Sequence, residues 1–297
     1  MAKALTVDQA VQTSNVVENR NRIWAALRHN RTAWFGVIAL LLICAGAVLA
    51  PFLTSHHPET IDMLAFQNGP SREHLLGTDS VGRDVFSRLL YGARVSLSIS
   101  LVAVLINITL GTLLGAVAGY VGGLTDQLIM RLSDSILAFP LLILVIVAVA
   151  IMGSSLLNLI IVIGLMSWPS TARIVRGQVL SVKREDYIAS AVTAGASNVH
   201  IITRHIVPNI LAPIIVIATF DAASIVLLEG SLSFLGLGVQ PPNPSWGNML
   251  SDAQSLVTLE RMPWLWIPPG LAIAITVLSL NFVGDALRQA LDPTSKG

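Results

Sequence analysis

The 297-residue chain has few charged residues and almost no cysteine. Asp, Glu, Lys and Arg make up 12% of the residues and hydrophobic residues 54%, a balance typical of membrane proteins. A net charge of +1 gives no general electrostatic attraction for nucleic acid, so we predict no nucleic-acid partner. The single cysteine, Cys44, excludes an intramolecular disulfide and a cysteine-rich metal site.

The sequence also lacks a nucleotide-binding motif. Its lysines are Lys3, Lys183 and Lys296, and none lies in a Gly-x-x-x-x-Gly-Lys-Ser/Thr phosphate loop. Any ATP hydrolysis that drives this protein must therefore take place in another subunit.

Motifs for other catalytic chemistry are missing too. The segment 230–236 is not a Gly-x-Ser-x-Gly elbow, and His-Glu-x-x-His does not occur. His56 and His57 are adjacent and His74 is nearby in an outer loop, so a metal contact is one alternative; because no helix or strand spacing aligns them, we favour solvated loop residues. We therefore predict no catalytic site, no metal site and no cofactor in this chain.

Long charge-free runs are what the sequence does contain. They predict an all-α polytopic membrane protein with spans at about residues 33–53, 95–121, 135–152, 157–176, 209–236 and 266–290. The third and fourth spans form a helical hairpin that turns at 153–158. We assign residues 31–293 to one transmembrane domain and residues 1–30 to a tail with an interfacial helix over 22–29.

Basic residues predict the orientation. Six spans place both termini on one side, together with the polar insert at 173–207, and this side holds most of the Lys and Arg residues. By the positive-inside rule it is cytoplasmic. The other side keeps Arg72, Arg83, Arg88, Arg94 and Arg261.

The insert between the fourth and fifth spans has a helical pattern. Its apolar residues share one stripe with Gly195: Ile188, Ala191, Val192, Val199, Ile202 and Ile206. Gly195 as a C-cap, followed by the N-cap residues Ser197 and Asn198, predicts two short helices that meet at a turn. We expect Pro208 and Pro213 to fix where the second helix ends and the fifth span begins. The pattern fits an interfacial loop or a docking element for a cytoplasmic partner.

Two acids interrupt the fifth span. Asp221 and Glu229 would each cost about 2.5–3.5 kcal/mol if they faced lipid at mid-membrane, so we expect them to face protein, a pathway or an interfacial zone. Hydrogen bonding inside the bundle and contact with a substrate both remain open. Asn107, in the second span, is a weaker candidate of the same kind.

The outer segments have a pattern of their own. Asp79 or Ser80 is placed to cap a helix that carries Val85, Phe86, Leu89 and Leu90 on one side. Prolines break the stretch before Trp246, which we expect at headgroup depth. This region either completes the fold at the outer interface or also receives an external binding protein. The candidate contact residues are Asp79, Arg83, Asp84 and Trp246.

The polar insert resembles the EAA loop of binding-protein-dependent ABC importer permeases, which forms coupling helices that dock on ATPase subunits. The matching positions are Asp186, Tyr187, Ala189, Ser190, Ala191, Gly195, Ile206 and Pro208, within a coupling loop at 180–208. The sequence departs from the family pattern at two of them. Ala189 stands where the family has Glu, and Ser190 stands where it has the first Ala.

Four further segments, 74–97, 119–140, 229–250 and 281–293, are similar to the C-type subunits of dipeptide and oligopeptide permeases. The resemblance covers about residues 22–293. It implies a type I importer permease of the bacterial cytoplasmic membrane that works with a second permease chain, two ATP-binding subunits that hold ATP and Mg²⁺, and an extracytoplasmic solute-binding protein. It implies di- or oligopeptides as substrates, with nickel, a glycoside or an opine as alternatives. An ATP-independent channel or secondary transporter is the alternative from another class.

Overall fold

The computed structural model describes residues 30–291. The tail and the interfacial helix expected over 22–29 lie outside these residues. Within them the secondary structure is helical, and β pairing is limited to one isolated bridge between Thr78 and Asp84. The elements are α2 (Arg31–Leu53), α3 (Val85–Val121), α4 (Gly123–Leu137), α5 (Leu141–Met152), α6 (Leu156–Val182), α7 (Asp186–Thr193), α8 (Asn198–His200), the π-helix η1 (Ile201–Ile206), α9 (Val207–Phe234), α10 (Trp246–Ser251), α11 (Leu256–Arg261) and α12 (Pro263–Leu291).

The long helices account for the membrane crossings. Among the described residues, 5 helices are long and apolar enough to span a membrane, or 6 when the bent pair α4 and α5 counts as one. This confirms the all-α polytopic fold. Helix α3 extends from Val85 to Val121 and is therefore longer than the span expected at 95–121.

The centre of the bundle is the packing of α3 against α6. Small residues let the two backbones come close. A Cβ atom on Gly115 would lie 2.5 Å from the carbonyl oxygen of Ala172, and one on Gly164 would lie 2.8 Å from the Cβ atom of Ile106. Larger side chains at these two positions would therefore separate the helices.

Helix α2 contains a proline, and a side chain of α3 replaces the backbone hydrogen bond that this proline cannot make. Pro51 has no N–H to donate to the carbonyl of Ala47, four residues earlier. The Arg94 side chain, on α3, donates its Nε–H to that oxygen and an Nη2–H to Val48 O at 2.7 Å. Arg94 thus satisfies the Ala47 carbonyl, which Pro51 cannot.

The third expected span, 135–152, is not one straight helix. Residues 135–137 belong to α4, and α5 begins only at Leu141, at an angle of 87° to α4. Pro140 explains the break, because it cannot donate a helical hydrogen bond and disfavours helical geometry at Phe139. The turn into α6 lies where the sequence placed it, and Asn158 Nδ2 closes it through the carbonyls of Met152 and Gly153 at 2.7 and 3.1 Å.

The fifth span was expected to begin after a break at Pro208, and this was wrong. The helix is continuous from Asn198 to Phe234. Just before Pro208 it widens to a π-helix, in which Val207 N–H donates to Ile202 O, five residues earlier. This widening relieves the clash and the missing hydrogen bond of a proline inside an α-helix. The side chain of Asn209 then donates to His205 O at 2.6 Å.

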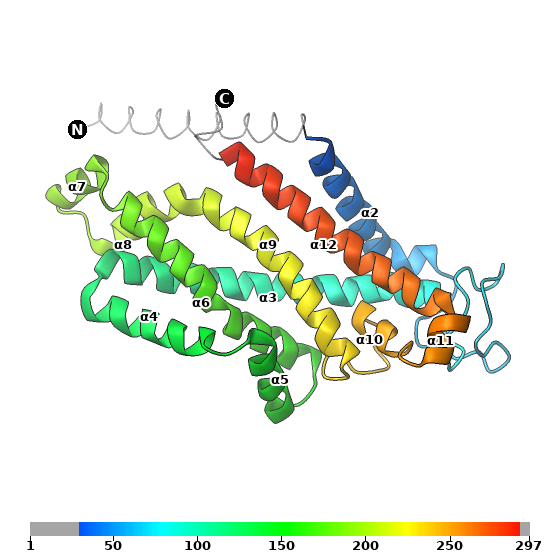
Figure 1. Ribbon diagram of the computed structural model, residues 1–297. Coiled ribbons are helices and arrows are strands. Elements are labelled where there is room, and N and C mark those ends of the chain that lie inside the picture. The colour runs from blue at the N-terminus through cyan, green and yellow to red at the C-terminus, as the bar shows by residue number, and fades with distance from the viewer. Residues whose placement is uncertain (1–29, 292–297) are drawn as a thin grey trace.

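The short helices mark two opposite ends of the bundle. Figure 1 shows α7 and α8 at one end, and α10, α11 and the segment 54–84 at the other. We call these the α7 end and the α10 end. Helices α3 and α9 run between the two ends (Figure 1).

Candidate functional site

The turn between α7 and α8 is a Schellman motif. Gly195 has φ +80°, its N–H donates to Val192 O at 2.9 Å, and Ala196 N–H donates to Ala191 O at 3.1 Å. Ser197 then caps α8 by accepting from His200 N–H at 3.3 Å. The predicted glycine turn and Ser197 cap are therefore present.

The buried face of this segment differs from the predicted stripe. Ile188, Ile201 and Ile206 are buried against the ends of α3 and α6, where they meet Tyr120, Val175 and Val179. In contrast Val192 is 54% exposed and Val199 71% exposed. The turn at Gly195 redirects the chain, so α7 and α8 do not present one continuous stripe, and the π-helix shifts the register of the residues after His200.

The remaining candidate coupling residues lie mostly on the surface. Asp186, Tyr187, Ala189, Ser190 and Pro208 are exposed, and Ala191 is partly buried. Partial desolvation of the Tyr187 hydroxyl raises its pKa, and the charge of Glu185 adds to this. The α7 end therefore has an anchored inner face and an exposed outer face.

Glu229 lies inside the bundle and is 1% exposed. Its two carboxylate oxygens accept hydrogen bonds from Ser96 Oγ of α3 at 2.9 Å and Ser233 Oγ at 2.7 Å. Each hydroxyl also accepts a backbone N–H, from Trp246 at 3.3 Å and from Val239 at 3.1 Å. Glu229 thus joins α3, α9 and α10, as the intrabundle alternative predicts.

Asp221 has a different setting, although it lies on the same helix. Its Oδ2 accepts from Asn107 Nδ2 at 2.7 Å and lies 3.2 Å from Thr171 Oγ1, which is also 2.9 Å from Asn107 Oδ1. Asp221 and Asn107 line a cavity of about 350 Å³ between α3, α4, α5, α6 and α9. The structure therefore brings two of the predicted polar residues together and adds Thr171, which the sequence alone does not single out.

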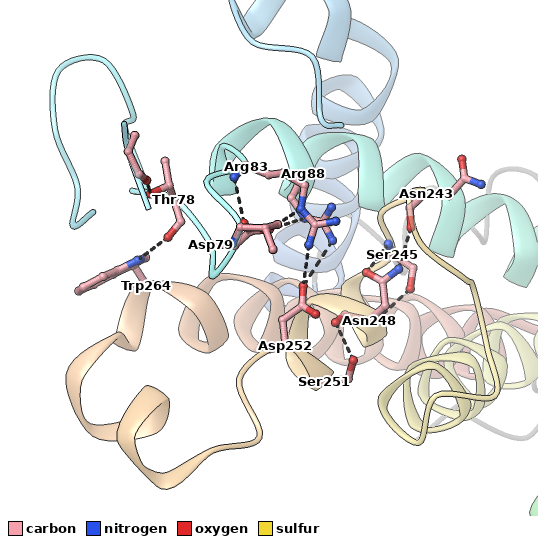
Figure 2. Close-up of polar contacts among 12 residues, drawn as sticks. Thr78, Asp79, Arg83, Arg88, Asn243, Ser245, Asn248, Ser251, Asp252 and Trp264 are labelled. Atoms are coloured by element: carbon pink, nitrogen blue, oxygen red, sulfur yellow. Dashed lines mark hydrogen bonds and ion pairs between the residues drawn. The ribbon is translucent and has the colours of Figure 1, made fainter. Parts of the chain in front are cut away.

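Four charged side chains form a cluster at the α10 end. Arg83 Nε lies 2.6 Å from Asp79 Oδ2, and Arg83 Nη2 lies 3.3 Å from Asp252 Oδ2. Arg88 lies 3.6 Å from each of these oxygens, and Figure 2 shows its guanidinium between the two acids. Burial raises the pKa of Asp252, as does Asp79, while Arg88 and Arg83 act in the opposite direction. The cluster ties the 77–88 segment to the end of α10.

The four side chains expected to contact a receptor are turned inward. Asp79, Asp84 and Trp246 are 2%, 4% and 1% exposed, and the Arg83 side chain is 12% exposed. Asp84, not Asp79 or Ser80, caps α3, because its Oδ2 accepts from Ser87 N–H at 2.7 Å. These residues shape the outer segment and do not form its surface.

Trp246 is buried in the core, so its indole is not on the surface as that of an interfacial anchor would be. Ser245 and Asn248 form a capping box that starts α10. The indole of Trp246 then packs on Ala47, Ala93 and Val226, and its Nε1–H donates to Leu89 O at 3.1 Å.

The histidines of the outer segment are not all solvated. His74 is 5% exposed, and its Nδ1 lies 2.9 Å from Asp84 Oδ1. His56, His74 and Asp84 come closest to a metal-site geometry among the described residues, with one potential ligand atom each within 4.8 Å of the others. Because both Asp84 oxygens already serve His74 and the α3 cap, we assign the cluster to the fold.

Sequence reasoning missed the partners of these groups. Ser96, Thr171 and Asp252 come from segments far from the acids and arginines that they contact. Small polar residues inside an apolar run are a signal that points to Ser96 and Thr171 but not to Asp252.

The sequence comparisons identify the class of this helical membrane protein. Residues 111–297 match the family of binding-protein-dependent transport system inner membrane components, and residues 20–70 match the N-terminal transmembrane domain of oligopeptide transport permease C. The chain belongs to this ABC importer permease family, in its C-type peptide permease branch, and is a multi-pass inner-membrane protein.

Individual relatives cover nearly the whole chain. The chain is 45% identical over 271 residues to the dipeptide transport system permease protein DppC of Alkalihalophilus pseudofirmus, covering 91% of this chain and 88% of the relative. It is 41% identical over 295 residues to the glutathione transport system permease protein GsiD of Escherichia coli, covering 99% and 97%. It is 39% identical over 267 residues to a peptide permease protein of Brucella suis, covering 90% and 88%.

Proposed function

We propose that this chain is one of two permease subunits of an ATP-driven importer of di- or oligopeptides. Relatives named for peptide, dipeptide and glutathione transport support this substrate class. A second permease chain would complete the path, an extracytoplasmic binding protein would deliver the substrate, and two ATPase subunits would hold ATP and Mg²⁺. The chain itself would catalyse no reaction.

The observation that best supports this proposal is the way the α7 segment packs on the membrane helices. Its inner face is fixed by Ile188, Ile201 and Ile206 on α3 and α6, and α8 continues without a break into α9. Its outer face exposes Tyr187, Val192 and Val199. An ATPase that binds this face more tightly in one state than in the other would shift the bundle between its two access states.

The charge distribution supports the orientation. Arg131, Arg173, Arg176, Lys183 and Arg184 lie on α4, α6 and the α6–α7 connection, so we place the α7 end and both termini in the cytoplasm. The α10 end, with the segment 54–84, would then meet the binding protein. The buried ion cluster would hold this surface in shape.

Reconstitution of the full complex in proteoliposomes tests the proposal. We expect uptake of a radiolabelled dipeptide only with ATP and the binding protein, and uptake without them would instead indicate a channel or secondary transporter. Ligand identification on the copurified binding protein separates peptides from nickel, a glycoside or an opine.

A substitution on the outer face of α7 tests coupling. Val192→Asp places a charge on a half-exposed position, so it should leave thermal stability unchanged but abolish ATPase docking and stimulated ATP hydrolysis. Ala189→Glu, which introduces the acid of the family pattern on the same segment, should retain both. Normal docking in Val192→Asp would remove the coupling role of this face.

A further inference from the structure

The cavity beside Asp221 combines an apolar wall with a short polar row. Apolar side chains of α4, α5 and α9 make up most of the lining, and the polar part consists of Asn107, Ser167, Ser170, Asp221, Ser224 and Ser231. Its volume of about 350 Å³ lies at the lower end of the range for small-molecule sites, roughly 300–1,000 Å³. Among the described residues that line it, Asp221 is the one ionisable group.

The carboxylate of Asp221 is only partly satisfied. Its hydrogen bonds from Asn107 and Thr171 both go to Oδ2. Within residues 30–291, no hydrogen bond reaches Oδ1, and no Lys, Arg or His nitrogen lies within 4.0 Å of either oxygen. An acid at this depth is expensive without a partner, and no basic side chain of the described chain supplies one.

The chemistry of the lining favours one kind of cation. A divalent metal ion prefers several carboxylates or imidazoles, whereas this cavity has one carboxylate among amide and hydroxyl groups. A primary ammonium group donates three hydrogen bonds and matches one carboxylate oxygen with neighbouring hydroxyl oxygens. The α-amino group of a peptide is such a cation.

We propose that Asp221 is a binding subsite for the primary ammonium group of the substrate on its way through the membrane. Asn107 and Thr171 act as positioning residues, because they hold Oδ2 and leave Oδ1 free for the ligand. This inference rests on the proposed function.

The test uses the full complex in proteoliposomes and two labelled peptides that differ only in acetylation of the amino terminus. The affinity of the binding protein for each peptide is measured first. The uptake rates are then corrected for any preference of the binding protein for one peptide. Asp221→Asn should lower ATP-driven uptake of the free-amine peptide about tenfold or more, the equivalent of one charge-assisted hydrogen bond. Uptake of the acetylated peptide should stay within about twofold of the unmodified complex, and Asp221→Glu should restore part of the lost uptake.

A matched control makes the same chemical change elsewhere. Asp134→Asn alters an exposed acid that pairs with Arg173, and should leave both uptake rates unchanged. Equal loss of both peptides in Asp221→Asn, or no loss of either, would overturn the inference. So would failure of that variant to assemble with the second permease, since Asp221 would then pair with a neighbouring subunit. Absence of ATP-driven peptide uptake by the unmodified complex would instead remove the proposed function.

Discussion

Asp221 and Glu229 lie about two turns apart on α9 and have opposite surroundings. Glu229 is sealed in the bundle, where serine hydroxyls from α3 and α9 reach both of its carboxylate oxygens. Asp221 lines a cavity and has hydrogen bonds on one oxygen. The same residue chemistry on one helix therefore joins elements in one place and, within residues 30–291, leaves one carboxylate oxygen without a hydrogen bond in the other.

The contrast extends to the two ends of the bundle. The α10 end is tied by the cluster of Asp79, Arg83, Arg88 and Asp252 and by the network around Glu229. The α7 end is anchored by apolar contacts and keeps an exposed outer face. We expect substitutions at the α10 end to reduce stability and substitutions near Asp221 or α7 to reduce transport.

The largest loss of stability is expected for Arg88→Met. The Arg88 side chain is 2% exposed, and its removal leaves Asp79 and Asp252 with one guanidinium between them. Breaking a buried ion pair costs about 3–5 kcal/mol, which thermal unfolding in detergent would detect. The control Arg173→Met breaks an exposed pair and should cost less than about 1 kcal/mol. Equal losses in the two variants would contradict a special role for the buried cluster.

The second-largest loss of stability is expected for Glu229→Ala, at about 2–4 kcal/mol in the free energy of unfolding. Two buried serine hydroxyls would lose their acceptor and a cavity would remain in the core. Glu229→Gln keeps the shape and one acceptor oxygen, so its loss should be smaller. Assembly with the partner subunits, measured by copurification, should decline in the same order. A Glu229→Gln variant that assembles and stimulates ATPase normally but does not transport would place Glu229 in the pathway instead.

Gly195→Ala should cost about 1 kcal/mol, because the glycine has φ +80° and no neighbouring atom lies within 4 Å of the added methyl. The cost is therefore backbone strain alone. Gly177→Ala is the control, since this glycine is inside α6 with equal space and should gain up to about 1 kcal/mol. Hydrogen exchange over residues 186–200 would show whether the loss stays local.

The smallest effect on stability is expected for Asp221→Asn, at less than about 1 kcal/mol by the same unfolding measurement. The amide can still accept from Asn107, and no ion pair of the described chain is lost. A loss as large as that of Glu229→Ala would remove the distinction between the two acids.

Several features followed from local sequence rules. Gly195 and Ser197 encode a turn and a cap through their own backbone and side-chain chemistry. The charge-free runs encode membrane helices, because each apolar residue favours insertion independently of its neighbours. The membership of the permease family likewise needed only the order of its motifs.

Other features depended on contacts between distant segments. The sequence singles out Asp79, Arg83, Asp84 and Trp246. It does not show whether these side chains are exposed for contact with a partner or buried in contacts within the chain. Pro208 was expected to end a helix, and the π-helix before it shows that local widening can absorb a proline. Val192 and Val199 belong to the predicted stripe, yet both are exposed, one on each side of the turn at Gly195.

The sequence by itself therefore determined an all-α membrane permease, its spans in outline and the turn between α7 and α8, because hydropathy, caps and turns act over a few residues. Only the tertiary structure decided which acid is sealed and which faces a cavity. That outcome depends on Ser96, Asn107 and Thr171, which reach α9 from α3 and α6, and no local pattern specifies such distant partners.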